Sequence, residues 1–578
     1  MDIQKILLFP ENGLNEELFF RTEKGKKHTS KENGCFIFRG SVIDLCTLFN
    51  CISIKKWRKY TYVKDIGIRV SGVGKITIQL FQYQYDGHAK QICNAQEIQI
   101  ENGGIFFPEL LDETEIVGLK IVALTDAYLK ELSVFSNNES QCEDDPRIAL
   151  NICTYHRDTC LKHNLEILTS EILNNPDSAL YQKLQVFITD NGGNFKLSCL
   201  EHESIHLAHE NELGSAGGFS CGAKRIISCA DQRFTHLIFM DDDIQLSVNA
   251  LERTYLFLRC LREEYKELTI GGSFMDANDP TIQIESGAVW NEGKVKSLKS
   301  GLDMTKLDAI VQNEQEEETS YMGWWYCCVP IICIEKRGYP APVYFHCDDV
   351  EFGLRNPCQL TLNGVCVWHP SFETKPSSIN KYYDIRNLAV VNAIHCPQYT
   401  KWKYLRSVWQ KTIVELLRFR YKDAKLVLQG ALDFCQGKEW ILKHDSGELY
   451  RHYKEQGYTL SNIHEFAEDF DLESYRSASC TSDPKWKKYT KMIFANGIFL
   501  PSSRKAILPA FEPPVERFWL VKTVLNYNSY DKTGFLTKRS VKETIEILRK
   551  LLHCSAVIIK KFAFAEETWK EKVGKTDE

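Results

Sequence analysis

The sequence predicts a multidomain α/β protein with an N-terminal antiparallel β-sandwich, a central α/β domain and a mainly helical C-terminal domain. Residues 1–135 hold short runs in which apolar and polar residues alternate, separated by Gly and Asn. Residues 147–395 alternate apolar strands with longer helical segments, and residues 396–578 follow a helical periodicity. The polar, acidic segment 136–146 predicts a linker between the first two domains.

The composition is typical of a soluble globular protein. The chain has 578 residues, enough for about three domains, of which 43% are hydrophobic and 26% charged. Its formal net charge of -6 gives no case for nucleic acid as a partner. No secretory pattern is present, the longest apolar run is far below the ~20 residues that cross a bilayer, and the 21 cysteines are expected to be reduced thiols. We therefore expect a cytoplasmic protein, with peripheral contact at the inner face of the cell membrane as an alternative.

Two alternating runs indicate the β-sandwich most clearly. Residues 66–70 and 76–80 alternate apolar with polar side chains, and the segment 71–74 between them predicts a turn. Similar short runs follow up to residue 122. Short strands at such regular spacing are typical of an antiparallel sandwich.

The most informative stretch is LIFMDDDIQL, residues 237–246. Its apolar part predicts a buried parallel strand, and Asp241, Asp242 and Asp243 stand at the carboxyl end, where α/β sheets bind ligands. Because side chains alternate along an extended chain, Asp241 and Asp243 share one side. Two carboxylates on one side suit a divalent cation that also holds phosphate oxygens. The alternative is an acidic exposed turn.

Polar residues also follow two other predicted strands. TYHR (154–157) follows the strand 148–153, and DNGGN (190–194) follows the strand 184–189. The segment 211–222, NELGSAGGFSCG, predicts a glycine-rich loop that leads into a helix. This segment matches no phosphate-loop or dinucleotide fingerprint, so a tight turn is an equal alternative.

Two acidic residues near the start of a predicted helix are candidates for proton transfer. In DDVEFGLR, residues 348–355, Asp348 and Glu351 have the spacing of a capping box. One carboxylate is then structural, and Asp349 is free to act as a base.

Two further signals in the central domain point to ligand binding. Trp324 and Trp325 are either core residues or, if exposed, a flat platform for a sugar. His369 directly follows the short apolar strand 365–368, where its imidazole would complete a metal site.

The C-terminal domain contains one basic amphipathic segment. Residues 401–425 combine a helical apolar face with many Lys and Arg side chains and with Trp402 and Trp409. Such a segment docks on anionic lipid or packs on its own domain with a solvated basic face, and we favour the second interpretation slightly. Residues 501–514 predict a loop and residues 541–552 another amphipathic helix.

The order of the motifs is the most specific signal in the chain. They are LFNCISIKKWRKYT in the N-terminal part, then TYHR, TDNGGN, NELGSAGGF, FMDDD, GWWY, DDVEFGLR, VWH and YYDIRN. In this order they resemble a family 2 glycosyltransferase with the GT-A, Rossmann-like fold. More narrowly, they resemble the polymerising galactofuranosyltransferases of cell-wall galactan synthesis.

The resemblance implies an inverting, metal-dependent transfer from a UDP-sugar, best matched by UDP-galactofuranose, to a glycan or lipid-linked glycan of the cell envelope. It makes Asp241, Asp243 and His369 ligands of Mn²⁺ or Mg²⁺, and the nitrogen ligand favours Mn²⁺. It makes Asp349 the base that takes the acceptor proton, beside Asp348.

The resemblance also implies residues that bind the two substrates. The nucleotide-sugar site would contain Thr154, Arg157, Asp190, Asn211, Gly217, Gly218 and Asp242. The acceptor and sugar pocket would contain Trp324, Trp325 and Glu351.

Three positions depart from the galactan enzymes. Cys347 and Phe372 stand where those enzymes carry tryptophan, and Asp384 stands where they carry histidine. All three lie near the expected donor or acceptor, so transfer of a galactofuranosyl group is favoured over polymerisation of galactan.

Several alternatives stay open. The donor is alternatively another nucleotide sugar, with a pyranose or deoxysugar group. A non-catalytic carbohydrate-binding protein is a second class, against which the intact aspartates and His369 argue. Metal-dependent phosphoryl transfer is a third, disfavoured because no phosphate loop is present. A homo-oligomer is as compatible with the sequence as a monomer.

Overall fold

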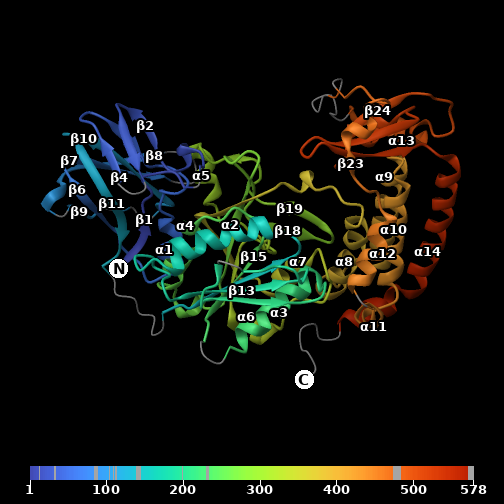
Figure 1. Ribbon diagram of the computed structural model, residues 1–578, viewed down its shortest axis with the longest axis horizontal. Helices are drawn as coiled ribbons and strands as arrows, with labels where there is room; N and C mark the ends of the chain where they lie inside the picture. The colour runs from blue at the N-terminus through green and yellow to red at the C-terminus, as the bar shows by residue number, and fades with distance from the viewer. Residues whose placement is uncertain are drawn as a thin grey trace.

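The computed structural model shows a multidomain, mostly α/β protein with mixed sheets (Figure 1). The division at residues 135, 147 and 395 stays a prediction, and most of the expected linker 136–146 lies outside the described residues. The structure describes residues 1–11, 13–30, 34–83, 89–102, 104–108, 110, 113–137, 145–197, 200–229, 233–444, 446–472, 475 and 483–570.

Two antiparallel sheets lie in the N-terminal part. One contains β1 (Asp2–Lys5), β3 (Lys27–Ser30), β4 (Gly34–Ile37), β6 (Gly67–Val73), β9 (Gly104–Phe106) and β11 (Ala127–Phe135). The other contains β2 (Arg21–Lys24), β5 (Val42–Asp44), β7 (Lys75–Tyr83), β8 (Ala89–Gln99) and β10 (Ile116–Ala123). Gly74, with φ 110°, takes the chain from the first sheet to the second between β6 and β7. Buried residues of both sheets contribute to one core.

A nine-stranded sheet forms the centre of the molecule. Its parallel part has the order β14-β13-β12-β15. The chain adds β13 and β14 on one side of β12 and then β15 on the other side, so the strand order reverses at β12. Ligands of α/β proteins bind outside the carboxyl ends of strands at such a reversal. These strands are β12 (Ile148–Thr154), β13 (Leu184–Asp190), β14 (Ile205–His209) and β15 (His236–Asp241).

The rest of this sheet brings a distant strand to the same region. The antiparallel strand β21 (Cys327–Pro330) joins β15 to β16 (Thr269–Asp276), and β16 pairs in parallel with β22 (Gln359–His369). A backbone bridge between Gln245 and Trp368, with N–O distances of 2.7 and 3.2 Å, ties the turn after β15 to the end of β22. The sheet also contains β17 (Ile282–Glu285) and β20 (Leu302–Asp303).

Helix α3 (Gly214–Ile227) corrects the prediction of a glycine-rich loop, because most of that segment is helical. A Cβ on Gly218 would lie 2.3 Å from Cys153 Sγ, and one on Gly222 would lie 2.0 Å from Asn151 Oδ1. These glycines therefore allow α3 to pack closely on β12. The other α-helices that lie between β12 and β22 in the sequence are α2 (Asp158–Leu168), α4 (Val248–Leu258), α5 (Leu307–Asn313), α6 (Ile331–Arg337) and α7 (Asp348–Arg355).

The C-terminal part is helical but also contains a four-stranded sheet that the sequence did not predict. β24 (Lys505–Pro509) lies within the segment expected to be a loop, and α14 (Val541–Lys570) is longer than the predicted helix. The sheet is completed by β23 (Ser461–Asn462), β25 (Thr523–Asn528) and β26 (Thr533–Lys538). The other helices are α8 (Asn380–His395), α9 (Lys401–Leu417), α10 (Tyr421–Phe434), α11 (Lys438–Lys443), α12 (Ser446–Gln456) and α13 (Lys485–Ile493).

The basic segment 401–425 packs largely on its own part of the chain, as the favoured interpretation predicts. Arg420 is buried and donates to Asn526 Oδ1 at 2.8 Å and to the Ala510 carbonyl at 2.7 Å. Arg418 is buried as well and donates to the Pro513 carbonyl at 3.0 Å. The four-stranded sheet and its loops supply these partners. The alternative that Arg418 and Arg420 dock on lipid is therefore wrong. In the described part of the chain, no helix combines the length and the apolarity needed to span a bilayer.

Candidate active site

Asp241, Asp243 and His369 come together at the carboxyl ends of β15 and β22. One ligand atom from each lies within 4.8 Å of the other two. His369 Nε2 is 3.2 Å from Asp243 Oδ1 and 4.0 Å from Asp241 Oδ2. The structure therefore brings together the three residues predicted as metal ligands, from positions more than a hundred residues apart.

Two cations surround Asp243 on its other side. Arg157 Nη1 lies 2.7 Å from Asp243 Oδ2, and Lys375 Nζ pairs with the same oxygen. Although desolvation opposes it, the nearby His369 imidazole and the charges of Arg157 and Lys375 lower the pKa of Asp243. Desolvation and then the negative charge of Asp243 raise the pKa of Asp241 to about 7. The two carboxylates thus share a site, but the pKa of Asp241 is raised and that of Asp243 is lowered.

The donor set fits a divalent cation. Two carboxylates and one imidazole suit Mn²⁺, and Mg²⁺ is also accommodated by the oxygen ligands. Asp243 Oδ1 is buried and has no hydrogen-bond partner among the described residues, although it faces His369. An unsatisfied buried carboxylate oxygen costs free energy that a bound cation would offset.

Asp242 is not part of this cluster. It is buried and accepts hydrogen bonds from Thr154 Oγ1 at 2.7 Å and from Arg157 Nη1 at 3.0 Å. Asp242 therefore links the end of β15 to the end of β12. Arg157 is held between Asp242 and Asp243, and the buried Thr154 hydroxyl orients Asp242 by its hydrogen bond.

An open pocket lies at the ends of β13 and β14. The pocket has a volume of about 350 Å³ and is lined by Tyr155, His156, Asn191, Gly192, Glu210, Asn211, Glu212 and Arg451. Asp190 lies beneath it, accepting from the backbone N–H groups of Phe195 at 2.7 Å and Gly192 at 2.9 Å. Although burial opposes it, these bonds and His209 lower the pKa of Asp190. Of the predicted donor residues, Asn211 lines this pocket, while Gly217 and Gly218 lie in α3.

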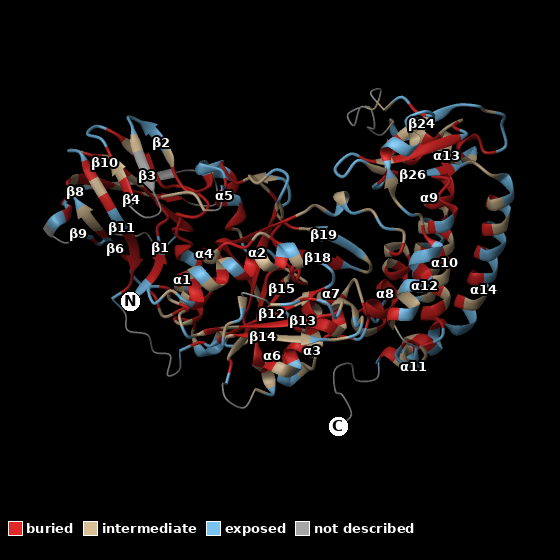
Figure 2. Ribbon diagram, in the orientation of Figure 1, coloured by how far each residue is buried: buried red, intermediate tan, exposed pale blue. Residues whose placement is uncertain are grey.

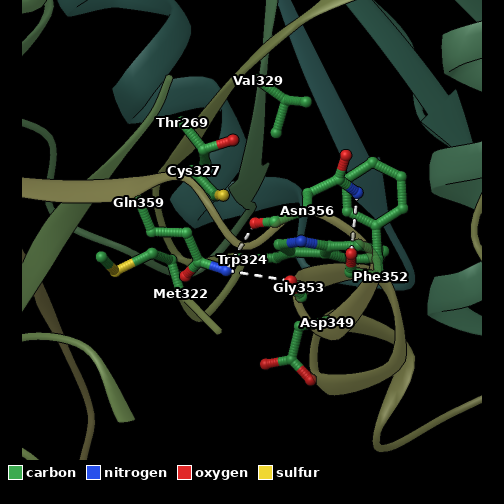
Figure 3. Close-up of a pocket in the computed structure, with 10 residues that line it drawn as sticks. All are labelled: Thr269, Met322, Trp324, Cys327, Val329, Asp349, Phe352, Gly353, Asn356 and Gln359. Carbon is green, nitrogen blue, oxygen red and sulfur yellow. Dashed lines mark hydrogen bonds between the residues drawn. The ribbon is translucent and has the colours of Figure 1, made fainter. Parts of the chain in front are cut away.

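Asp349 lies on the first turn of α7 and lines a small pocket with Trp324 and Phe352 (Figure 3). It is half-buried, and its Oδ1 accepts from the backbone N–H of Val350 at 2.7 Å. Burial, followed by the negative charges of Asp348, Glu285 and Asp241, raises the pKa of Asp349 well above its usual value. A carboxylate with a raised pKa that still reaches a pocket suits a general base.

The predicted capping box at Asp348 and Glu351 is wrong. The residue before the helix is Cys347, and Asp348 Oδ2 accepts instead from Ser215 Oγ of α3 at 2.6 Å. Glu351 is fully buried and pairs with Arg355 at 2.8 Å and with His395 of α8 at 3.0 Å. Spacing alone did not reveal Ser215 and His395, which come from other helices. Glu351 thus joins α7 to α8.

The segment before α7 has an unusual backbone. Tyr344, His346 and Cys347 have φ values of 70°, 64° and 64°, in the left-handed region that favours glycine. Side chains of α8 hold this segment, because Asn387 Nδ2 donates to the carbonyls of Phe345 at 2.6 Å and His346 at 2.8 Å. The YYDIRN motif therefore fixes the entry into α7, and strained backbone of this kind concentrates at functional sites.

Neither tryptophan forms the exposed platform that was one of the two expectations. Trp324 is 5% exposed and stacks on Phe239 with centroids 4.4 Å apart. Trp325 is 6% exposed, and its Nε1 donates to the Gly272 carbonyl at 2.8 Å. Both indoles are core residues at the edge of the site, so their place in an acceptor pocket stays a prediction.

Three further residues of this region were not predicted as site residues. Lys375 pairs with Asp243, the 59% exposed ring of Phe372 lies 5.9 Å from the ring of His369, and Glu285 lies buried near Asp349. Burial raises the pKa of Glu285 to about 7. Of these, only Phe372 had a signal in the sequence, as a departure from the galactan enzymes. Lys375 and Glu285 belong to no motif.

Comparison with known proteins agrees with this arrangement of motifs. No protein-family model matches the chain. The galactofuranosyltransferase GlfT2 of Mycobacterium tuberculosis is 22% identical over 457 residues, which cover 73% of this chain and 69% of that protein. The chain is a distant relative of this enzyme. GlfT2 of Mycolicibacterium smegmatis is 21% identical over 449 residues, covering 72% of this chain and 68% of that protein.

These two GlfT2 relatives confirm the resemblance predicted from the motifs. Solved structures add nothing to it. A GH115 4-O-methyl-α-glucuronidase covers 20% of this chain and 17% of its own, with 10% identity and a TM-score of 0.14. CBM22-1-GH10 xylanase modules cover 34% and 38%, with 8% identity and a TM-score of 0.16. Such scores carry no conclusion about the fold.

Proposed function

We propose that the chain is an inverting, metal-dependent glycosyltransferase that moves a galactofuranosyl group from UDP-galactofuranose to a glycan or lipid-linked glycan of the cell envelope. The observation that carries the proposal is that two clusters of acidic residues lie close enough for Asp241 to affect the pKa of Asp349. One group, Asp241 and Asp243 with His369, has a donor set for a cation. The other contains Asp349, whose raised pKa suits a base. The relationship to GlfT2 supports the chemical class.

The donor would lie across the ends of β12, β13 and β15. The pocket beside Asn191 and Asn211 is large enough for a nucleoside. The diphosphate would then lie against Arg157 and Lys375, whose positive charges suit phosphate oxygens. A cation held by Asp241, Asp243 and His369 supplies neutralisation of the departing diphosphate when bound.

The acceptor would approach Asp349. Its carboxylate would take the proton from the acceptor hydroxyl as that oxygen attacks the anomeric carbon, and a single direct displacement inverts the configuration there. Phe372, exposed next to His369, offers the sugar a flat apolar face that the buried tryptophans do not. In this proposal residues 147–395 form the GT-A domain, between the sandwich of residues 1–135 and the C-terminal domain of residues 396–578.

The test is a donor screen by mass spectrometry. The protein is incubated with Mn²⁺, with a panel of UDP-sugars and with synthetic galactofuranosyl glycans, and transferred mass is recorded for each pair. Transfer from UDP-galactofuranose alone is the expected result. Transfer only from a pyranose or deoxysugar donor would contradict the choice of donor and keep the reaction class. Retention of glycans without any transfer would indicate a carbohydrate-binding protein instead.

A further inference from the structure

Helix α13 presents its apolar face to solvent. Trp486, Tyr489 and Ile493 are spaced to lie on one side of the helix, and they are 72%, 59% and 80% exposed. No residue of α13 is buried. The helix contacts two short turns, Ala495–Gly497 and Val515–Phe518, and is drawn at the top of the C-terminal part in Figure 1.

The polar side of the same helix faces the protein. Lys491 Nζ donates to Asp483 Oδ2 at 2.5 Å and approaches the Glu516 carbonyl at 3.4 Å, with only 17% of its side chain exposed. Lys488 lies on the same side, 4.0 Å from the buried Glu516 carboxylate. A helix on a protein surface normally buries its apolar face and exposes its charges. In α13 this arrangement is reversed, so the exposed face has the composition of a contact surface.

The exposed apolar surface continues beyond the helix. In the turns that follow α13, Phe494, Phe499 and Leu500 are 62%, 69% and 49% exposed. We refer to these three residues with Trp486, Tyr489 and Ile493 as the α13 patch. In Figure 2 α13 lies at the top of the C-terminal part, and α11 lies at the bottom. Six large, well-exposed apolar side chains within fifteen residues indicate a binding surface.

We propose that the α13 patch docks the protein on an anionic membrane surface. Lys485 and Lys487 are exposed beside the patch and form no ion pair with the described residues, so the surface is locally basic on a chain of net charge -6. Trp and Tyr next to Lys, with Ile, Phe and Leu to insert, are the side chains that favour the interface between lipid headgroups and acyl chains. The exposed lysines are complementary in charge to anionic headgroups, which would pair with them.

The proposal goes beyond sugar transfer and does not depend on it. It also differs from docking through residues 401–425, since Arg418 and Arg420 are buried. Docking through α13 would hold the C-terminal part at the bilayer through a reversible contact, because apolar insertion and a few lysines give far less affinity than a spanning helix.

The experiment is co-sedimentation of the full chain with two kinds of vesicle. One contains phosphatidylcholine alone, and the other contains equal amounts of phosphatidylcholine and phosphatidylglycerol. The wild-type protein is expected to bind the second kind and to be released partly by salt. The double variant Trp486→Ser/Ile493→Ser should reduce the partition coefficient at least about tenfold, because two inserted side chains are lost. Lys485→Glu/Lys487→Glu should weaken binding to the anionic vesicles only.

Leu552→Ser is the matched control. Leu552 is 61% exposed on α14 and lies outside the α13 patch, so its substitution removes exposed apolar surface elsewhere and should leave vesicle binding unchanged. All variants change exposed side chains and should keep the melting temperature and the turnover of a water-soluble acceptor. A failure of sugar transfer with intact vesicle binding would therefore affect the proposed function and not this one.

Two results would overturn the proposal. One is absence of wild-type binding to the anionic vesicles. The other is unchanged vesicle binding by the double variant, above all if light scattering shows that the same variant lowers the mass of the free protein. In that case the α13 patch is a contact between copies of the chain.

Discussion

The site contains two pairs of aspartates whose surroundings differ. Around Asp243 the fold gathers His369, Arg157 and Lys375, and its pKa is lowered. Around Asp349 the closest charges are negative, and its pKa is raised. The same side chain is thus prepared for holding a cation in one place and for exchanging a proton in the other. Environment, and not residue type, assigns the two roles.

The strongest test of this contrast removes the cation-binding carboxylate. Asp243→Asn keeps the shape but removes the charge that balances Arg157, Lys375 and a bound metal. We expect turnover to fall at least about 10³-fold, because several kcal/mol of charge stabilisation are lost. Initial rates with Mn²⁺ measure this, and calorimetry should show lost Mn²⁺ binding. Excess chelator should reproduce the loss in the wild type, reversibly; full activity in chelator would contradict the metal site.

The second test removes the base. Asp349→Asn should lower kcat about 10²–10⁴-fold while the affinity for the UDP-sugar stays close to that of the wild type. Donor affinity is measured by titration calorimetry and kcat by product mass. A large loss of donor affinity with unchanged kcat would assign Asp349 to binding.

The pH profile separates Asp349 from Asp243 without removing either carboxylate. A base must be deprotonated, so a raised pKa of Asp349 means that kcat falls with decreasing pH well above the ordinary carboxyl value of 3.8. Asp243, with its lowered pKa, should stay ionised through this range. Because the charge of Glu285 contributes to the raised pKa, Glu285→Gln should move the acid limb to lower pH. An acid limb that stays in place would remove Glu285 from the site.

Lys375→Met tests the positive charges around Asp243, and its expected effect is smaller. The variant loses one charge at Asp243 and, in the proposed function, one contact with the diphosphate. We expect KM for the donor to rise roughly tenfold, the size of one charged hydrogen bond. The matched control is Lys381→Met, which removes a lysine paired with Glu415. Steady-state kinetics compare the two.

The smallest effect is expected at Asp348. It accepts from Ser215 and caps no helix, so Asp348→Asn should change the free energy of unfolding by about 1 kcal/mol. Its charge raises the pKa of Asp349, so the acid limb of kcat should shift slightly to lower pH. Denaturant unfolding and the pH profile check both points. A loss of turnover as large as that of Asp349→Asn would transfer the role of base to Asp348.

Sequence periodicity was sufficient for the strands that carry the site. The apolar run before Asp241 and the strand before His369 are β15 and β22, and Asp242 accepts from Thr154 and does not join the cluster of Asp241, Asp243 and His369. Contacts between distant elements were not accessible in this way. Lys375 reaches Asp243, Ser215 reaches Asp348 and His395 reaches Glu351 across the fold, and no local pattern encodes such pairs.

The sequence did not decide which apolar residues face inward. The glycines of α3 are needed for close packing on β12, although a glycine-rich run suggests a loop. The paired tryptophans are in the core, whereas the aromatic residues of α13 are outside. The packing partners decide which side of each helix or strand is covered.

The left-handed backbone before α7 has a consequence for natural and laboratory variation. At Tyr344, His346 and Cys347 glycine and asparagine would fit the observed φ values without strain, while valine, isoleucine and threonine would not. Orthologues and selected variants should therefore show a narrow choice of residues there. A glycine at any of the three would relieve strain and loosen the turn that carries Asp349, so gains in folding would come with losses in turnover. A deep mutational scan scored separately for abundance and for activity would show these positions as ones where the two scores diverge.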